Sequence, residues 1–316
     1  MPNVTDADYI SSFIAETLQE KGLLRSPVPL RRYRQGGEDP DSKLVFMSDG
    51  EPALVVTVSP PEFPDVVAEE CLKVAQMRSR LGDLSGPVLQ PLDTGRVETS
   101  SYAVLPYRKP FSRRRLVQRI HRNWARHHVL EWLLQIALRR SAPCEVSRFE
   151  ASLQALSGKV RPDSPTAALL AAAGKHLRSG RFAPKTAPMH GDLWRGNVLR
   201  GSVSTAFTLV DWRGSQTDGF PIFDLIRLAE SFGLSTKALG RELRRHQTAL
   251  GCQVADLPLY LLGALGHYAA HPGEMSLALF QSMADGCATR ISLALSTPVD
   301  VWIHPPGAMS PLPDAR

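Results

Sequence analysis

Apolar positions near the start of the chain recur with the period of a helix. Their spacing of three and four residues places them on one helix face: Ile10, Phe13, Ile14 and Leu18. Thr5 or Asp6 can cap this helix, and Gly22 can end it. The sequence therefore predicts an amphipathic helix that begins near Thr5 and ends before Gly22.

The pattern then shortens to that of strands. Short apolar runs bounded by turn residues predict strands at residues 30–35, 43–47, 53–59, 88–94 and 101–107. Turns that contain glycine separate the first three strands: Gly36-Gly37 and Asp49-Gly50. A helical pattern over residues 66–81 interrupts the series. These elements predict a small, β-rich lobe over residues 1–106.

Beyond this lobe the pattern is mainly helical. Helical spacing covers residues 111–180 and 222–295, and a loop-rich stretch between them holds one apolar strand at residues 206–210. The layout predicts an α+β, protein-kinase-like fold of two lobes, with a larger helical lobe over residues 107–298. Residues 299–316 are rich in proline and predict a poorly ordered tail. A ligand is expected between the two lobes.

Composition narrows the class of protein. The chain has 316 residues, of which 43% are hydrophobic and 22% charged, as in a globular protein with a core. Its formal net charge of +6 suits an anionic ligand, such as a nucleotide, a nucleic acid or a membrane surface. Four scattered cysteines and a start unlike a signal peptide favour a cytoplasmic protein with reduced thiols. No apolar run reaches about 18 residues, so no transmembrane segment is expected.

The loop-rich stretch carries the residues that phosphoryl transfer requires. Asp192 and Asn197 lie five residues apart in a loop that contains glycine, and Asp211 directly follows the apolar strand. One carboxylate can orient an attacking hydroxyl group, while a second carboxylate and a neutral oxygen can hold Mg²⁺ between phosphates. Magnesium suits such a site because it takes few protein ligands together with phosphates and water.

These residues also resemble a known family. His190-Gly191-Asp192, followed by Asn197 and then by Val210-Asp211-Trp212, is similar to the motifs of the aminoglycoside phosphotransferase/choline kinase family, relatives of protein kinases. The resemblance implies that Asp192 is the catalytic base and that Asn197 and Asp211 bind Mg²⁺. It further implies that His190 supports the loop and that Asp224, after Pro221, is structural.

One position departs from the family pattern. The family carries a lysine in the third strand, where Thr57 stands here, although Glu70 or Glu69 can supply its usual glutamate partner. A neutral hydroxyl group cannot replace that charge. Lys43 or Arg34 can supply a cation from another strand, the alignment of this lobe can be wrong, or the protein can be an inactive pseudokinase.

The resemblance also suggests where a nucleotide binds. Gly36 and Gly37 can form the turn that covers its phosphates, although an ordinary hairpin turn explains them equally well. Leu105 and Tyr107 lie where the hinge would contact adenine by backbone groups. ATP is the expected nucleotide, and GTP remains an alternative.

A basic segment follows the hinge. It holds seven cations within 15 residues: Arg108, Lys109, Arg113, Arg114, Arg115, Arg119 and Arg122. It is either a solvated helix face or a site for an anionic partner, and membrane-surface contact through residues 113–122 is one such alternative. Nucleic acid is not expected, because interleaved aromatic residues are missing.

Together these features predict a small-molecule kinase that uses Mg²⁺ and ATP to phosphorylate a hydroxyl group of a metabolite or sugar. The basic chain argues against polycationic aminoglycosides, which need an acidic pocket, and an anionic acceptor is the alternative. A catalytically weak or inactive pseudokinase that acts as a binding or regulatory protein remains the second hypothesis, because Thr57 replaces the family lysine.

Overall fold

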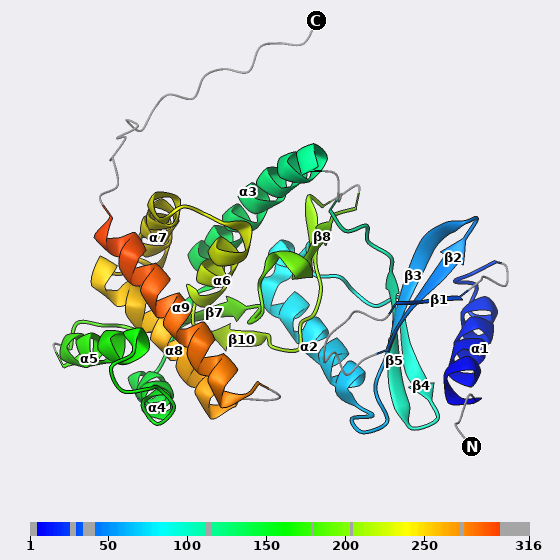
Figure 1. Ribbon diagram of the computed structural model, residues 1–316, viewed down its shortest axis with the longest axis horizontal. Helices are drawn as coiled ribbons and strands as arrows, with labels where there is room; N and C mark the ends of the chain where they lie inside the picture. The colour runs from blue at the N-terminus through cyan, green and yellow to red at the C-terminus, as the bar shows by residue number, and fades with distance from the viewer. Residues whose placement is uncertain are drawn as a thin grey trace, which may run out of the picture.

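The computed structural model describes residues 5–25, 30–33, 42–111, 115–178, 180–202, 205–271 and 275–297. An antiparallel sheet forms the N-terminal part, and helices form most of the C-terminal part (Figure 1). This arrangement confirms the predicted α+β, protein-kinase-like fold class.

The N-terminal sheet has five antiparallel strands in the order β1-β2-β3-β5-β4. The elements of this part are α1 (Thr5–Glu20), β1 (Leu30–Tyr33), β2 (Ser42–Ser48), β3 (Glu51–Val58), β4 (Asp93–Val97) and β5 (Ser100–Pro106). The strand predicted at residues 88–94 is wrong in position. Val88 instead forms an isolated bridge with Leu209, which draws this segment toward the C-terminal part.

The two faces of the sheet have different neighbours. One face packs against α1, which lies on the side of the sheet away from the helical part (Figure 1). Ile14 and Leu18 of α1 are buried there together with Phe46 and Val56. Because side chains alternate along a strand, the residues between these buried positions face the other way, toward the helical part.

Helix α2 (Val66–Leu81) connects the sheet with the helical part and lies between them in Figure 1. At its start, the backbone N–H of Val67 donates to the Ser59 hydroxyl at 3.0 Å, and that of Ala68 donates to the Ser101 hydroxyl at 3.1 Å. Two serines of the N-terminal sheet region thus satisfy amide groups that a helix start leaves without partners. Further along, α2 buries its apolar side chains in the core of the helical part.

The C-terminal part contains seven α-helices in the described residues. They are α3 (Arg115–Arg140), α4 (Val146–Ser157), α5 (Pro165–Leu177), α6 (Phe223–Phe232), α7 (Thr236–Leu250), α8 (Leu257–Ala270) and α9 (Leu277–Ser296). Short 3-10 helices are η1 (Gly82–Ser85), η2 (Arg195–Asn197) and η3 (Val254–Asp256). Within the described ranges no single helix is long and apolar enough to span a membrane. One pair of helices, α7 joined to η3–α8 across a bend of 102°, has the length and apolar composition of a span.

Five short strands position the loops of the predicted site. They are β6 (Ala142–Pro143), β7 (Lys185–Met189), β8 (Val198–Arg200), β9 (Phe207–Leu209) and β10 (Gln216–Gly219). β7 ends immediately before His190, and β9 ends two residues before Asp211. Strands β8 and β9 pair as an antiparallel hairpin in which Val198 lies opposite Leu209. This pairing brings the loop that contains Asp192 next to the loop that contains Asp211.

Candidate active site

Asp224, in the first turn of α6, anchors the loop that carries Asp192. Its two carboxylate oxygens accept hydrogen bonds from the backbone N–H groups of His190, at 2.6 Å, and Gly191, at 3.0 Å. Burial raises the pKa of Asp224, while the nearby His190 and these two hydrogen bonds act in the opposite direction. The Asp224 side chain therefore lies beneath the loop, where it holds the backbone.

His190 joins the two loops through both nitrogens of its ring. Nδ1 lies 3.3 Å from the backbone N–H of Asp192, and Nε2 lies 3.0 Å from the carbonyl oxygen of Val210. Nδ1 must accept and Nε2 must donate, which selects the neutral Nε2–H tautomer. Burial lowers the pKa of His190 and favours the same neutral form. The ring also packs against Trp212, with 4.4 Å between ring centroids.

Asn197 fixes the Asp192 carboxylate. Its side-chain Nδ2 donates to the backbone oxygen of Asp192 at 2.9 Å and to Oδ2 of the same residue at 3.0 Å. Both donor hydrogens of the amide are thereby used, so that its Oδ1 atom is the acceptor left for another ligand. The five-residue spacing seen in the sequence thus corresponds to a direct contact.

The environment of Asp192 opposes its ionised form. Burial raises the pKa of its carboxyl group, and the negative charge of Asp211 raises it further. Arg227, Asn197 and the Trp194 side chain act against this shift. Arg227 extends from α6 to place a guanidinium nitrogen 3.9 Å from Asp192 Oδ1. Arg227 was not predicted as a site residue, although its position one helical turn after Asp224 is a signal that both residues contact the same loop.

Asp211 lies in a loop with a constrained backbone. Its φ of 65° falls in the left-handed region, which residues other than glycine seldom adopt. Arg213 is a charge partner of this carboxylate, and its Nε lies 3.5 Å from Asp211 Oδ1. No cluster of three or more His, Cys, Asp or Glu side chains that could hold a metal occurs among the residues described. The Asp211 carboxylate and Asn197 Oδ1 are oxygen donors, the kind of ligand that could hold Mg²⁺ together with phosphates.

Tyr268 of α8 ties the same two loops together from the other side. Its hydroxyl lies 3.1 Å from the carbonyl oxygen of Gly191 and 3.3 Å from that of Gly214. Gly191 has a φ of 86°, and a Cβ atom added to it would lie only 2.2 Å from the Gly214 oxygen. Only glycine fits this approach. Tyr268 could not be predicted from a motif, because it lies in a buried helix far along the chain from both loops.

The structure describes only some of the residues that are expected to bind the nucleotide. Gly36, Gly37 and Arg34 lie outside the described residues. Lys43 lies directly opposite Thr57 in the β2–β3 pair, so both side chains start on the same face of the sheet.

Leu105, Tyr107 and Glu70, the other residues expected near the nucleotide, lie in the described part of the structure. Leu105 lies in β5 opposite Val55. The Tyr107 N–H already donates to the Ala53 oxygen at 2.8 Å, so it is not available to adenine. Glu70 of α2 contacts the loop that follows Asp211, where its Oε1 accepts a hydrogen bond from the Trp212 N–H at 2.9 Å.

The basic segment is only partly described. Arg113 and Arg114 lie outside the described residues, as do the side chains of Arg115 and Arg119. The Arg122 side chain donates to the carbonyl oxygen of Phe232 at 2.7 Å, which ties α3 to the end of α6. At Arg122, therefore, the segment contributes to packing within the helical part.

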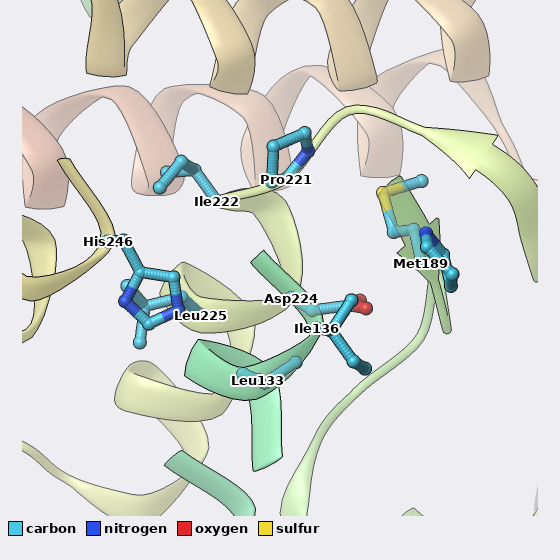
Figure 2. Close-up of a pocket in the computed structure, with 9 residues that line it drawn as sticks. Leu133, Ile136, Met189, Pro221, Ile222, Asp224, Leu225 and His246 are labelled. Carbon is cyan, nitrogen blue, oxygen red and sulfur yellow. The ribbon is translucent and has the colours of Figure 1, made fainter. Parts of the chain in front are cut away.

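A small buried cavity lies behind the Asp192 loop and is distinct from the pair formed by Asp192 and Asp211. Its free volume of about 20 Å³ is enough for a water molecule. Asp224 of α6 and His246 of α7 provide its titratable lining, among apolar side chains such as Ile136 and Met189 (Figure 2). The cavity is too small for a nucleotide or a sugar.

Comparison of the sequence with protein families gives one match. A model described as the phosphotransferase enzyme family matches residues 32–259. A search among curated proteins gives no match. The match spans the sheet, both loops and the start of α8.

Solved structures with the same fold share little sequence. A thermostable mutant of the aminoglycoside phosphotransferase APH(4)-Ia, in a ternary complex with ADP and hygromycin B, is 15% identical with a TM-score of 0.53. That comparison covers 88% of this chain and 98% of the other. The choline kinase LicA from Streptococcus pneumoniae is 15% identical with a TM-score of 0.51, and the shares covered are 89% and 99%. Both likenesses extend over nearly the whole of the solved chains.

Proposed function

Because the chain belongs to the phosphotransferase enzyme family, we propose that it is a small-molecule kinase that transfers the γ-phosphoryl group of ATP to a hydroxyl group. One observation carries this proposal. Asn197 contacts the Asp192 carboxylate directly, while His190 connects the same loop to Val210, the residue before Asp211. These contacts support the proposal, because phosphoryl transfer requires a base and oxygen ligands for a metal close together, and Asp192, Asn197 and Asp211 are the candidates for these roles.

In the proposed reaction Asp192 orients the acceptor hydroxyl and takes its proton. The acceptor oxygen then forms a bond to the γ-phosphorus as the bond to the β-phosphate oxygen breaks, and ADP leaves. Asn197 Oδ1 and Asp211 would hold Mg²⁺, which supplies positive charge to the phosphates when bound. Arg227 partly offsets the negative charge at the base, and Asp224 and His190 keep the loop in place.

We assign the missing cation to Lys43. Lys43 lies opposite Thr57 in the sheet, and both face away from the core that α1 covers. A long side chain from the neighbouring strand can therefore serve the phosphates that a lysine at position 57 would serve. This geometry supports an active kinase over the pseudokinase, for which Thr57 remains the one favouring observation.

The acceptor is proposed to be a small hydroxylated molecule, with a sugar and an anionic compound as the two classes to compare. The solved relatives do not choose between them, because one is a complex with hygromycin B and the other is a choline kinase. ATP is the proposed nucleotide, since the APH(4)-Ia complex holds ADP, and GTP is its alternative.

The experiment measures ADP formation with Mg·ATP or Mg·GTP against a panel of sugars, sugar phosphates and amino alcohols. We expect wild type to turn over at least one acceptor and Asp211→Asn to lose most of this activity. Asparagine keeps the size and tolerates the left-handed backbone of residue 211, so folding should survive. Nucleotide binding by wild type without turnover of any acceptor would instead support the pseudokinase.

A further inference from the structure

Two side chains of α2 contact the backbone just after Asp211. Glu70 Oε1 accepts the N–H of Trp212 at 2.9 Å. Lys73, one helical turn further along, donates from Nζ to the carbonyl oxygen of Arg213. An acceptor and a donor on one helix face thus bind an amide and a carbonyl of the same loop.

Helix α2 is a rigid support for these contacts. Its first amides are bound by Ser59 and Ser101, while Val74, Met77 and Leu81 lie in the core of the helical part with 5%, 1% and 0% exposure. Because Glu70 and Lys73 lie between these two attachments, their positions are fixed relative to both parts of the molecule.

The loop itself needs such support. Asp211 holds a left-handed backbone conformation, which is unfavourable by about 1 kcal/mol or more for a residue with a side chain. Surrounding contacts must therefore keep it there. The next residue, Trp212, is 1% exposed, and its indole donates to the Leu209 oxygen at 3.2 Å. The α2 contacts bind the N–H of Trp212 itself and the carbonyl oxygen of the next residue, Arg213.

We propose that Glu70 and Lys73 are positioning residues that clamp the loop after Asp211 and so aim its carboxylate at the metal. The metal role of Asp211 rests on the proposed function, whereas the clamp itself is a property of the loop without ligands. Glu70 acts here through a side-chain oxygen, which accepts a hydrogen bond from a backbone amide. Glutamine at position 70 keeps such an oxygen, and alanine removes it.

The clamp is tested first without any ligand, by hydrogen exchange in peptides that span residues 207–216. Glu70→Ala should speed exchange there, Glu70→Gln should retain most protection, and Glu69→Ala should match wild type. Glu69 is a suitable control because it is the neighbour of Glu70 in the sequence and its own side chain is exposed. Unchanged exchange in Glu70→Ala, at unchanged global stability, would show that no clamp exists.

The consequence for Asp211 is tested by the Mg²⁺ concentration that half-maximally raises the melting temperature in the presence of ATP. Glu70→Ala and Lys73→Met should each raise it about tenfold, as the loss of one hydrogen bond to a charged group allows. Glu70→Gln and Lys73→Arg should stay near wild type. If glutamine is as damaging as alanine, Glu70 acts through its charge and the positioning role is wrong.

The two measurements separate this inference from the proposed function. If wild type shows no Mg²⁺-dependent shift while Glu70→Ala still loosens residues 207–216, the kinase proposal fails and the clamp stands. If wild type binds Mg·ATP and the alanine and methionine variants bind it equally well, the positioning role fails and the kinase proposal stands.

Discussion

Neighbouring carboxylates take different roles because their surroundings differ. Asp224 is 5% exposed, and both of its carboxylate oxygens accept hydrogen bonds from backbone amides. Asp192, in contrast, has its Oδ1 atom 3.9 Å from the guanidinium group of Arg227. A carboxylate that only holds backbone cannot also receive a substrate proton. The geometry thus separates a supporting residue from a candidate base that lies within the same loop system.

Replacing Asp192 by asparagine should lower kcat about 10²- to 10⁴-fold, because a general base is lost. The amide keeps the size of the side chain, so the melting temperature should change little. Steady-state ADP formation and thermal unfolding measure the two effects. Asp49→Asn, in an exposed turn, is the matched control. A variant at Asp192 with wild-type kcat would remove this residue from the reaction.

The position of the nucleotide cation can be tested by exchanging two cross-strand neighbours. Lys43→Thr should weaken Mg·ATP binding about tenfold or more, since an ion pair with phosphate is lost. Adding Thr57→Lys to that variant should restore much of the affinity, because both side chains start on the same face of the sheet. Isothermal titration calorimetry with Mg·ATP provides the measurement. Failure of Lys43→Thr to weaken binding would assign the cation elsewhere.

Gly191 allows the Asp192 loop to approach the Asp211 loop. Gly191→Ala should destabilise the protein by more than about 2 kcal/mol and abolish activity, since strain at positive φ and a clash with Gly214 act together. Gly22 has a φ of 68° but open space around it, so Gly22→Ala should show the backbone strain alone, about 1 kcal/mol. Urea unfolding compares the variants. Equal losses at the two positions would contradict the close approach.

At the scale of elements, the sequence predicted correctly those helices and strands whose boundaries depend on residues nearby in the chain. The helix predicted at residues 66–81 agrees with α2, because its apolar spacing and the prolines before it act locally. The strand predicted at residues 88–94 shifted to β4, because Val88 and Pro87 bind Leu209 of β9. That contact spans over 100 residues. Strand boundaries set by distant partners leave no mark in a local pattern.

The candidate site shows the same division. The motifs around Asp192 and Asp211 predicted a base and a metal site, and the described geometry brings these residues together. Tyr268 and Lys73 could not be predicted, since each contacts loop backbone from a distant helix. Backbone carbonyls carry no sequence signature, so the residues that bind them stay hidden until the fold is known. The roles of the site residues themselves remain predictions.

Helix α7 should make stability depend on pH through His246. This side chain is 2% exposed, its Nδ1 donates to the Glu242 oxygen at 2.9 Å, and burial lowers its pKa from 6.5 to about 4. Below pH 6.5 the unfolded chain binds a proton that the folded protein does not, so the free energy of unfolding falls as pH falls toward about 4. The loss is at most about 1.4 kcal/mol per pH unit.

Urea unfolding at several pH values between 7 and 4 measures this dependence. His246→Gln should show a shallower fall in the free energy of unfolding than wild type, whatever its stability at neutral pH. His127→Gln, at an exposed position of α3, should keep the wild-type slope. Identical slopes for all three proteins would mean that His246 does not titrate on unfolding.

At the scale of the whole molecule, the core divides into two hydrophobic clusters, and α2 packs in one of them while hydrogen bonds hold its start to the sheet region. One cluster joins α1 to the N-terminal sheet, and the other fills the helical part and includes Val74, Met77 and Leu81 of α2. The proposed nucleotide cation lies on the sheet, whereas Asp192 and Asp211 lie on loops of the helical part. Binding of Mg·ATP should therefore depend on the two clusters being folded at the same time.

Matched core substitutions can show whether the two clusters unfold separately. Leu18 and Leu261 are both 0% exposed, but Leu18 lies in the sheet cluster and Leu261 in the helical one. Each change to alanine should cost about 2–5 kcal/mol in its own cluster. Hydrogen exchange should then speed in β2, β3 and β5 for Leu18→Ala, while α8 and α9 keep their protection. Leu261→Ala should loosen α8 and α9.

Saturating Mg·ATP should slow exchange in the sheet of Leu18→Ala, because the nucleotide binds only when the sheet is folded against the loops. ADP gives a comparison that lacks the γ-phosphate. Uniformly faster exchange across both clusters in Leu18→Ala would instead mean that α2 makes the molecule a single cooperative unit. In that case the same clamp that positions Asp211 would also transmit the loss of α1 packing to the helical part.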